Sequence, residues 1–174
     1  MPLNTRVERL IKEVPNFPKP GILFKDITPI FSDPELCGDI TAHIANTFRG
    51  VDAVAGIESR GFFWGMGVAQ YLEVPFVPIR KAGKLPRKTI GQAYSLEYGD
   101  AKLEMHDDAI QQGWKVLIHD DLLATGGTAE AAARLISFIG KVAGFSFIVE
   151  LEKLAGRKRL SNFGVPVDSL ISYP

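Results

Sequence analysis

The chain has 174 residues, of which 46% are hydrophobic and 23% charged, a composition typical of one globular domain with its own core. Its 20 basic and 20 acidic residues cancel, which argues against a general nucleic-acid binder, because such a protein needs a basic excess to displace counterions. One cysteine, no apolar run of membrane-spanning length and no signal-peptide pattern lead us to expect a cytoplasmic protein without membrane contacts.

The N-terminal segment predicts a helix followed by an extended turn. Apolar residues recur at helical spacing over residues 4–14, which indicates a helix capped by Asn4 or Thr5. Three prolines and a glycine in residues 15–21 forbid a helix and favour an extended, turned segment. A short, mostly apolar segment follows over residues 22–27.

The rest of the chain alternates helices with short apolar strands. Asp33 and Pro34 suit the cap and first position of a helix that ends near Phe48, and further helices are expected to run to about Tyr71 and over residues 128–139. The four expected strands are short and rich in apolar residues, and they cover residues 51–57, 75–80, 116–120 and 144–151. This alternation predicts an α/β fold, a mostly parallel sheet with helices on both faces and ligands at the carboxyl ends of its strands.

A long polar stretch, residues 81–103, interrupts this alternation. It contains four lysines, one arginine and three glycines. A structureless segment of this length inside a compact domain is usually functional. We therefore expect a mobile lid loop here.

The strongest chemical signal is the run 116–128, in which a strand ends in Asp120 and Asp121 and leads through Thr-Gly-Gly-Thr into a helix. The glycines let the backbone approach a ligand, and the helix start offers unpaired N–H groups and a positive dipole end, which together predict a monophosphate cradle. The carboxylates would repel a phosphate, so we expect them to accept hydrogen bonds from a diol such as a ribose. The alternative interpretation is a solvated acidic turn. Neither a P-loop nor a dinucleotide fingerprint occurs at this turn.

Cationic residues follow two of the expected strands. Arg60 comes just after residues 51–57, and Arg80, Lys81 and Lys84 end or follow the next strand. Guanidinium and ammonium groups gathered at ligand-facing strand ends suit a pyrophosphate. Each of these residues alone also fits a solvated surface position.

The run 116–128 resembles the signature of the type I phosphoribosyltransferases, which bind 5-phosphoribosyl-1-pyrophosphate (PRPP). Four further blocks narrow the resemblance to the adenine phosphoribosyltransferase family, and they lie at residues 17–26, 56–62, 79–86 and 94–99. The resemblance implies the type I phosphoribosyltransferase fold in one domain over residues 1–174. It also implies a small N-terminal hood over about residues 15–35 and a lid over about residues 81–103.

The resemblance also assigns roles to particular residues. The ribose hydroxyls of PRPP would be held by Asp120 and Asp121. The 5′-phosphate would be wrapped by Ala124, Thr125, Gly126, Gly127 and Thr128. The pyrophosphate would be bound by Arg60, Arg80, Lys81 and Lys84. The adenine would be bound by Leu23, Phe24 and Lys25, and the catalytic residues would be Glu97, Tyr98 and Arg60.

Three positions depart from the patterns of related enzymes. Enzymes that act on 6-oxopurines resemble this loop but carry an acidic residue where this chain has Ala124, which favours adenine. Lys25 stands where many members of the family have arginine, and His119 stands where the strand usually has an aliphatic residue. We expect His119 to be a hydrogen-bonded structural residue, although a strand-end histidine could also titrate near neutral pH.

The expected reaction is the transfer of phosphoribose from PRPP to adenine, giving AMP and pyrophosphate. The resemblance and the usual coordination of Mg²⁺ imply an ion bound mainly through PRPP or pyrophosphate, with no dedicated protein metal site. The resemblance also suggests a homodimer, the commonest closed assembly. Two alternatives stay open: transfer to another purine base, and a PRPP-sensing regulator without catalysis.

Overall fold

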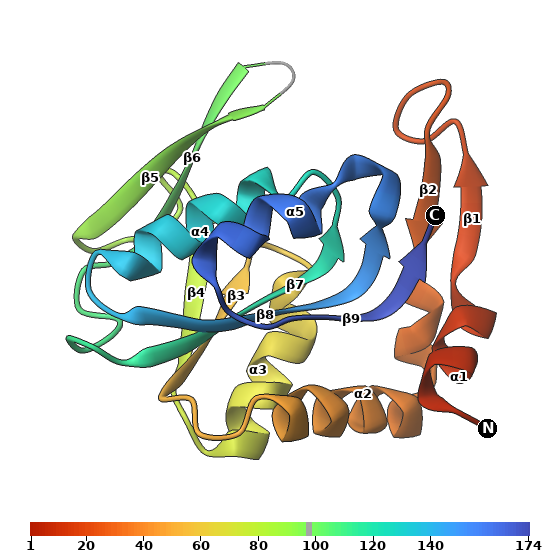
Figure 1. The fold of residues 1–174 in the computed structure, drawn as a ribbon, viewed down its shortest axis with the longest axis horizontal. Helices are drawn as coiled ribbons and strands as arrows, with labels where there is room; N and C mark the ends of the chain where they lie inside the picture. The colour runs from red at the N-terminus through yellow and green to blue at the C-terminus, as the bar shows by residue number, and fades with distance from the viewer. Residues whose placement is uncertain (97–98) are drawn as a thin grey trace.

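A seven-stranded sheet with the order β5-β6-β4-β3-β7-β8-β9 runs through the computed structural model, which describes residues 1–96 and 99–174 (Figure 1). Its parallel strands are β3 (Ala53–Ile57), β4 (Phe76–Lys81), β7 (Lys115–Leu123), β8 (Lys141–Leu151) and β9 (Val167–Tyr173). An antiparallel hairpin of β5 (Thr89–Leu96) and β6 (Gly99–His106) extends the sheet beyond β4. The predicted mostly parallel α/β fold is confirmed.

Helices cover both faces of the sheet, as Figure 1 shows. One face carries α2 (Pro34–Thr47) and α3 (Gly61–Leu72), and the other carries α4 (Gly127–Ser137) and the short α5 (Gly156–Leu160). Within the described residues, 3-10 turns lie at Thr28–Ser32, Glu152–Leu154 and Ser161–Phe163. The side chain of Asp33 accepts a hydrogen bond from Leu36 N at 2.9 Å, so the predicted cap of α2 is confirmed.

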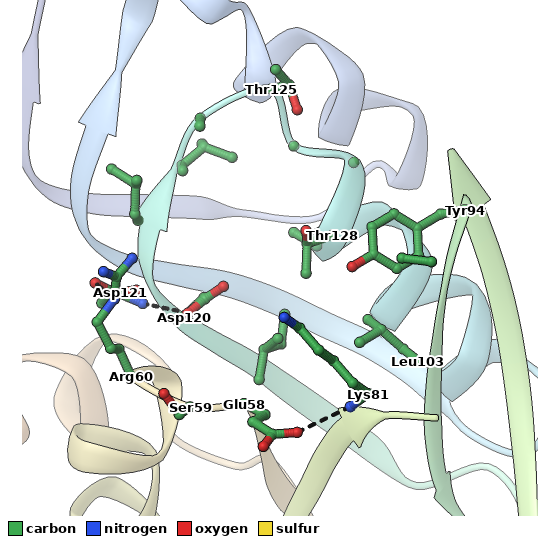
Figure 2. Close-up of a pocket in the computed structure, with 18 of the residues that line it drawn as sticks. Glu58, Ser59, Arg60, Lys81, Tyr94, Leu103, Asp120, Asp121, Thr125 and Thr128 are labelled. Atoms are coloured by element: carbon green, nitrogen blue, oxygen red, sulfur yellow. Dashed lines mark hydrogen bonds and ion pairs between the residues drawn. The ribbon is translucent and has the colours of Figure 1, made fainter. Parts of the chain in front are cut away.

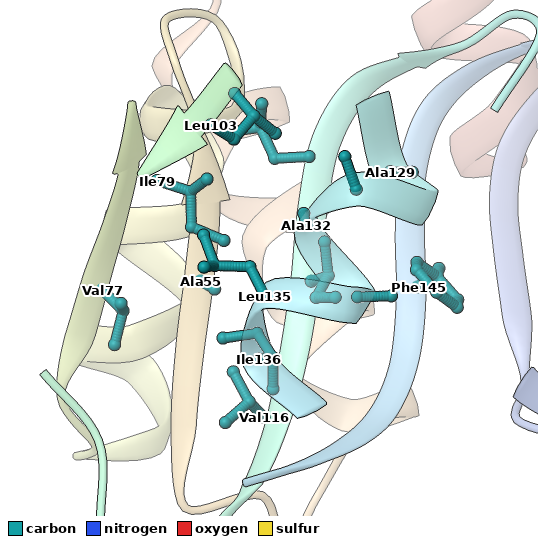
Figure 3. Close-up of a cluster of buried hydrophobic side chains, with 14 of the residues drawn as sticks. Ala55, Val77, Ile79, Leu103, Val116, Ala129, Ala132, Leu135, Ile136 and Phe145 are labelled. Atoms are coloured by element: carbon teal, nitrogen blue, oxygen red, sulfur yellow. The ribbon is translucent and has the colours of Figure 1, made fainter. Parts of the chain in front are cut away.

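The sheet separates two hydrophobic clusters, which explains why its central strands are apolar on both faces. Figure 3 shows the cluster beneath α4, where Leu135 and Ile136 pack against Val116 and Ala55 of the sheet. Leu103 of β6 closes the same cluster from the hairpin side. The hairpin is thus joined to the core by buried side chains as well as by strand pairing.

The prediction of a structureless loop over residues 81–103 is wrong, because most of it pairs as the β5–β6 hairpin. One face of the hairpin is apolar. Leu103 and Met105 are buried, and Ile90 and Tyr94 pack against the same core. The polar residues that suggested a loop occupy the opposite positions of an amphipathic ribbon.

The predicted first helix is too long at its C-terminal end. The helix α1 (Leu3–Leu10) stops early because residues 12–15 form β1 (Lys12–Pro15), which pairs antiparallel with β2 (Leu23–Asp26). Pro2 occupies the cap position without a side-chain hydrogen bond, so the predicted cap at Asn4 or Thr5 is also wrong. Strand pairing in three dimensions outweighs helical spacing in this segment.

Pro78 lies inside β4, between two other strands, where a proline would normally break the ladder. The pairing of β4 with β6 begins only at Arg80 and Lys81, so position 78 needs no donor on that side.

Strand β9 and helix α5 had no counterpart among the sequence-based expectations. No helix in the described part of the chain is both long and apolar enough to cross a bilayer.

Candidate active site

A cavity of about 660 Å³ lies at the carboxyl ends of β3, β4 and β7, between the turn after β7 and the hairpin (Figure 2). This is the edge where a parallel sheet is expected to bind ligands. Many of the residues predicted from the sequence line it together: Arg60, Lys81, Lys84, Asp120, Asp121, Ala124, Thr125, Gly126, Gly127 and Thr128.

Residues 124–128, called the phosphate-binding loop after the role predicted from the sequence, connect β7 to α4. Gly126 occupies the cap position of α4 with φ of 78°, a left-handed conformation that favours glycine. Its carbonyl oxygen accepts the first helical hydrogen bond, from Glu130 N at 2.8 Å. The amides at the start of α4 are therefore free of helical partners on the side of the cavity, as an anion site requires.

The two adjacent acids at the end of β7 lie in different surroundings. Asp120 is partly exposed on the cavity wall, and its Oδ1 accepts a hydrogen bond from Asp121 N at 2.8 Å. Burial, followed by the charge of Asp121, raises the pKa of Asp120 well above its usual range. The side chain of Asp121 is only 6% exposed and forms an ion pair with Arg60, Oδ2 to Nε 2.7 Å.

Glu58 is a site residue that the sequence analysis missed. Its Oε1 accepts hydrogen bonds from Arg80 Nη2 at 3.0 Å and from Lys84 Nζ at 3.1 Å, and its Oε2 accepts one from the Lys81 amide at 3.1 Å. The hydrogen bond from Arg80 is the main cause that lowers the pKa of Glu58 to about 2. An acid directly after a buried strand, at the ligand-facing edge, is the signal that could have identified it.

Three of the four cationic residues predicted to bind pyrophosphate line the cavity, and the fourth, Arg80, does not. Arg60, Lys81 and Lys84 line the cavity, and the side chain of Lys81 points into it (Figure 2). Arg80 instead donates to Glu58 and to the Lys84 carbonyl, at 3.0 and 3.1 Å, and it supports the cavity wall without facing the space.

Among the described residues that line the cavity, none comes from β2, where Leu23, Phe24 and Lys25 lie. The Phe24 ring nevertheless lies 5.5 Å from the guanidinium carbon of Arg60, at the cavity's edge. Lys25 contacts the Glu13 carboxylate, and its ammonium group lies 3.7 Å from the centre of the Tyr173 ring. Leu23 is 47% exposed.

The predicted catalytic residues Glu97 and Tyr98 lie outside the described residues. On the same hairpin, Tyr94 and Leu103 line the cavity.

His119, just before the two acids, is fully buried, and its Nδ1 lies 3.4 Å from Ser146 Oγ. Burial lowers the pKa of His119 to about 4, so the ring is neutral at pH 7.

Residues 29–165 match the family model of the phosphoribosyl transferase domain. The chain belongs to the phosphoribosyl transferase family. It is 46% identical to the adenine phosphoribosyltransferase of Cytophaga hutchinsonii, over 98% of this chain and 96% of that one. It is 50% identical to the enzyme of the same name from Jannaschia sp., over 96% and 95%.

Solved structures of adenine phosphoribosyltransferases share the fold. The Rhodothermus marinus structure has a TM-score of 0.92 and 47% identity, with 98% of each chain covered. The Saccharomyces cerevisiae structure, a complex with an imino-altritol bisphosphate and adenine, has a TM-score of 0.90 and 38% identity, with 97% of this chain and 98% of that one covered. The resemblance stated from the sequence is thus confirmed.

Proposed function

We propose that this enzyme transfers the 5-phosphoribosyl group of PRPP to adenine and releases AMP and pyrophosphate. The observation that carries the proposal is the single cavity in which the phosphate-binding loop, Asp120 and the cations of the β4 end face one another. This arrangement matches, in order, the phosphate, the diol and the pyrophosphate of PRPP. The relatives over nearly the whole chain carry the name of this activity.

In the proposed reaction, a ring nitrogen of adenine forms a bond to the anomeric carbon of PRPP. The bond from that carbon to the pyrophosphate oxygen breaks, its electron pair leaves with pyrophosphate, and the base loses a proton. Positive charge builds on the ribose during this exchange, so fixed phosphates and a neutralised leaving group lower the barrier.

We assign the 5′-phosphate to residues 124–128, whose free helix-start amides line the cavity. We assign the ribose hydroxyls to the two acids of β7, with Asp120 facing the cavity and Asp121 paired to Arg60. The pyrophosphate would contact Arg60, Lys81 and Lys84, with Arg80 behind them.

We assign the adenine to Leu23, Phe24 and Lys25 of the hood, because the Phe24 ring lies against Arg60 at the cavity's edge. Glu97 is proposed to handle the proton of the base, with Tyr98 and Arg60 as the other catalytic residues, on the strength of the family resemblance. The hairpin would act as the lid that keeps water from hydrolysing PRPP.

A magnesium ion is proposed as the cofactor. Within residues 1–96 and 99–174, no group of three or more His, Cys, Asp or Glu side chains could hold a metal ion. Two of the three described carboxylates that line the cavity are paired with cations, Asp121 with Arg60 and Glu58 with Arg80, which suits an ion held mainly by substrate phosphate oxygens and water. When bound, it would neutralise charge on the leaving pyrophosphate.

We further propose that the enzyme is a homodimer formed through an apolar surface on α3. Phe63 and Met66 of α3 are 54% and 47% exposed, and Phe31 packs against Phe63 with ring centroids 4.8 Å apart. An exposed aromatic cluster of this kind is typical of an interface. Replacing Phe63 by Glu should give monomers in light scattering after size-exclusion chromatography, and an unchanged mass would contradict this interface.

We also propose that residues 1–174 form one domain and that the protein is cytoplasmic. The single cysteine, Cys37, cannot form an intrachain disulfide, so the fold does not depend on an oxidising compartment. Cell fractionation would test the location, and limited proteolysis would test whether residues 1–174 resist cleavage as one unit.

The function is tested by incubating the pure protein with PRPP, Mg²⁺ and each purine base in turn, while pyrophosphate release is measured. We expect turnover with adenine and at least about 100-fold less with hypoxanthine, guanine or xanthine. Turnover with another base would establish the first alternative. Binding of PRPP without turnover on any base would establish the second alternative, a PRPP-sensing regulator without catalysis.

A further inference from the structure

Gly156, at the start of α5, lies against the phosphate-binding loop and does not line the cavity. A Cβ atom at position 156 would lie 2.4 Å from the carbonyl oxygen of Ala124 and 2.7 Å from Leu123 Cδ1. A Cβ atom at Gly126 would in turn lie 3.0 Å from the Gly156 carbonyl oxygen. Two glycines therefore let two backbone segments pack directly on each other.

The backbone conformation of Gly156 is not the reason for a glycine there. Gly126 has a φ of 78°, but Gly156 is not among the residues with positive φ. Alanine could adopt the conformation at position 156 without strain. The loop, and above all the Ala124 carbonyl, is what excludes a side chain.

The start of α5 is itself firmly anchored by the next residue. Arg157 Nε donates to both oxygens of Glu150, at 3.0 and 3.2 Å, and the Glu150 side chain is only 5% exposed. The same guanidinium donates through Nη1 to the Val167 carbonyl at 2.6 Å and through Nη2 to Ser169 Oγ at 3.2 Å. These bonds tie α5 to β8 and β9, so pressure between α5 and the loop would displace the loop.

A second contact from α5 reaches the other end of the loop. Arg159 Nη1 lies 3.0 Å from the position that a Cβ atom on Gly127 would take, and 3.6 Å from Glu130 Oε2 of α4. The loop is thus supported at Ala124 and Gly126 by Gly156, and at Gly127 by Arg159.

We propose that the start of α5 is a rigid support for the phosphate-binding loop, and that Gly156 is a positioning residue for the 5′-phosphate without contacting it. The inference rests on the proposed function of residues 124–128. Relief of the 2.4 Å contact would move the Ala124 carbonyl by about 1 Å, enough to misdirect amides that must be held to within about 0.5 Å.

The test compares the binding of AMP and adenosine, which differ by the phosphate alone, to wild-type protein, Gly156→Ala and Gly38→Ala. Position 38 lies in α2 with nothing within 4 Å of an added Cβ, so it is a matched control. Calorimetry should show about tenfold weaker AMP binding for Gly156→Ala, with unchanged adenosine binding. Gly38→Ala should bind both ligands as wild type does.

Wild-type affinity for AMP in Gly156→Ala would overturn the inference, as would an equal loss for AMP and adenosine. If circular dichroism shows that Gly156→Ala does not fold, Arg157→Lys serves as the second test variant. Lysine keeps the positive charge at position 157 but lacks the planar guanidinium that anchors α5. It should weaken AMP binding about threefold and leave adenosine binding unchanged, and wild-type AMP binding would overturn the inference. Absence of AMP binding by the wild-type protein would overturn the proposed function, and the inference with it.

Discussion

Asp121 and Arg60 form an ion pair, Oδ2 to Nε 2.7 Å, that joins the end of β7 to the start of α3. The carboxylate is almost fully buried, and the guanidinium carbon of Arg60 lies 5.5 Å from the Phe24 ring. The ion pair, together with the contact between Arg60 and Phe24, thus connects the acidic end of β7 to the hood. Through it, Asp121 affects the site by holding Arg60.

Replacing Asp121 by Asn should lower kcat/KM for PRPP at least about tenfold, because Arg60 loses its charged partner and its fixed orientation. The free energy of unfolding should fall by about 1 kcal/mol. Steady-state kinetics and urea denaturation measure both quantities. Asp108→Asn is the control, since Asp108 pairs with Arg87 on the surface, with its side chain 62% exposed. Equal kinetics for the two variants would contradict the role of Asp121.

Glu58 should make the protein less stable in acid. Its pKa in the folded state is about 2, below the unfolded value of 4.5, so its contribution is complete above pH 4.5 and is lost as the pH falls toward 2. Glu58→Gln removes this titration, so its stability should fall less steeply than that of wild type in the same window. Denaturation at several pH values measures the slopes. Glu8→Gln, at an exposed position, serves as the control, and a wild-type slope in Glu58→Gln would count against the interpretation.

His119 should act in a separate pH window. Its folded pKa of about 4 lies below the ordinary histidine value of 6.5, so the unfolded chain takes up a proton first and stability falls as the pH drops from 6.5 to 4. The loss is at most about 3 kcal/mol. His119→Leu should flatten this slope and leave kcat within about twofold of wild type, as expected for a structural residue. His106→Gln, on the hairpin, should keep the slope, and a large fall in kcat for His119→Leu would instead assign His119 to catalysis.

The two N-terminal helices should respond differently to loss of their expected caps. Asp33→Ala removes the hydrogen bond to Leu36 N and should cost about 1 kcal/mol of unfolding free energy with unchanged kinetics. Asn4→Ala should cost much less, because Asn4 lies inside α1 and its Oδ1 accepts only an exposed hydrogen bond from the adjacent Thr5 amide, at 2.9 Å. Thermal denaturation of both variants checks this, and equal losses would contradict the assigned caps.

The elements that local patterns predicted well are the buried strands and the helices that follow them. Residues 53–57, 115–123 and 141–151 are strands because their continuous apolar runs suit a sheet covered on both faces. The turn at residues 124–128 was also predictable, since the left-handed conformation of Gly126 and the helix that begins there follow from neighbouring residues. The elements that were missed depend on distant partners. The hairpin of residues 89–106 packs its apolar face against α4, and β1 pairs with β2.

The chain's own sequence determined the glycine turn at residues 124–128 and the central strands with the helices that follow them, because these elements follow from the conformational preferences of neighbouring residues. The tertiary structure decided which charges are paired: Asp121 with Arg60, and Glu58 with Arg80 and Lys84. It also decided that Gly156 lies against Ala124. Such contacts join residues that are far apart in the chain, and the strength of each depends on burial, which only the assembled fold establishes.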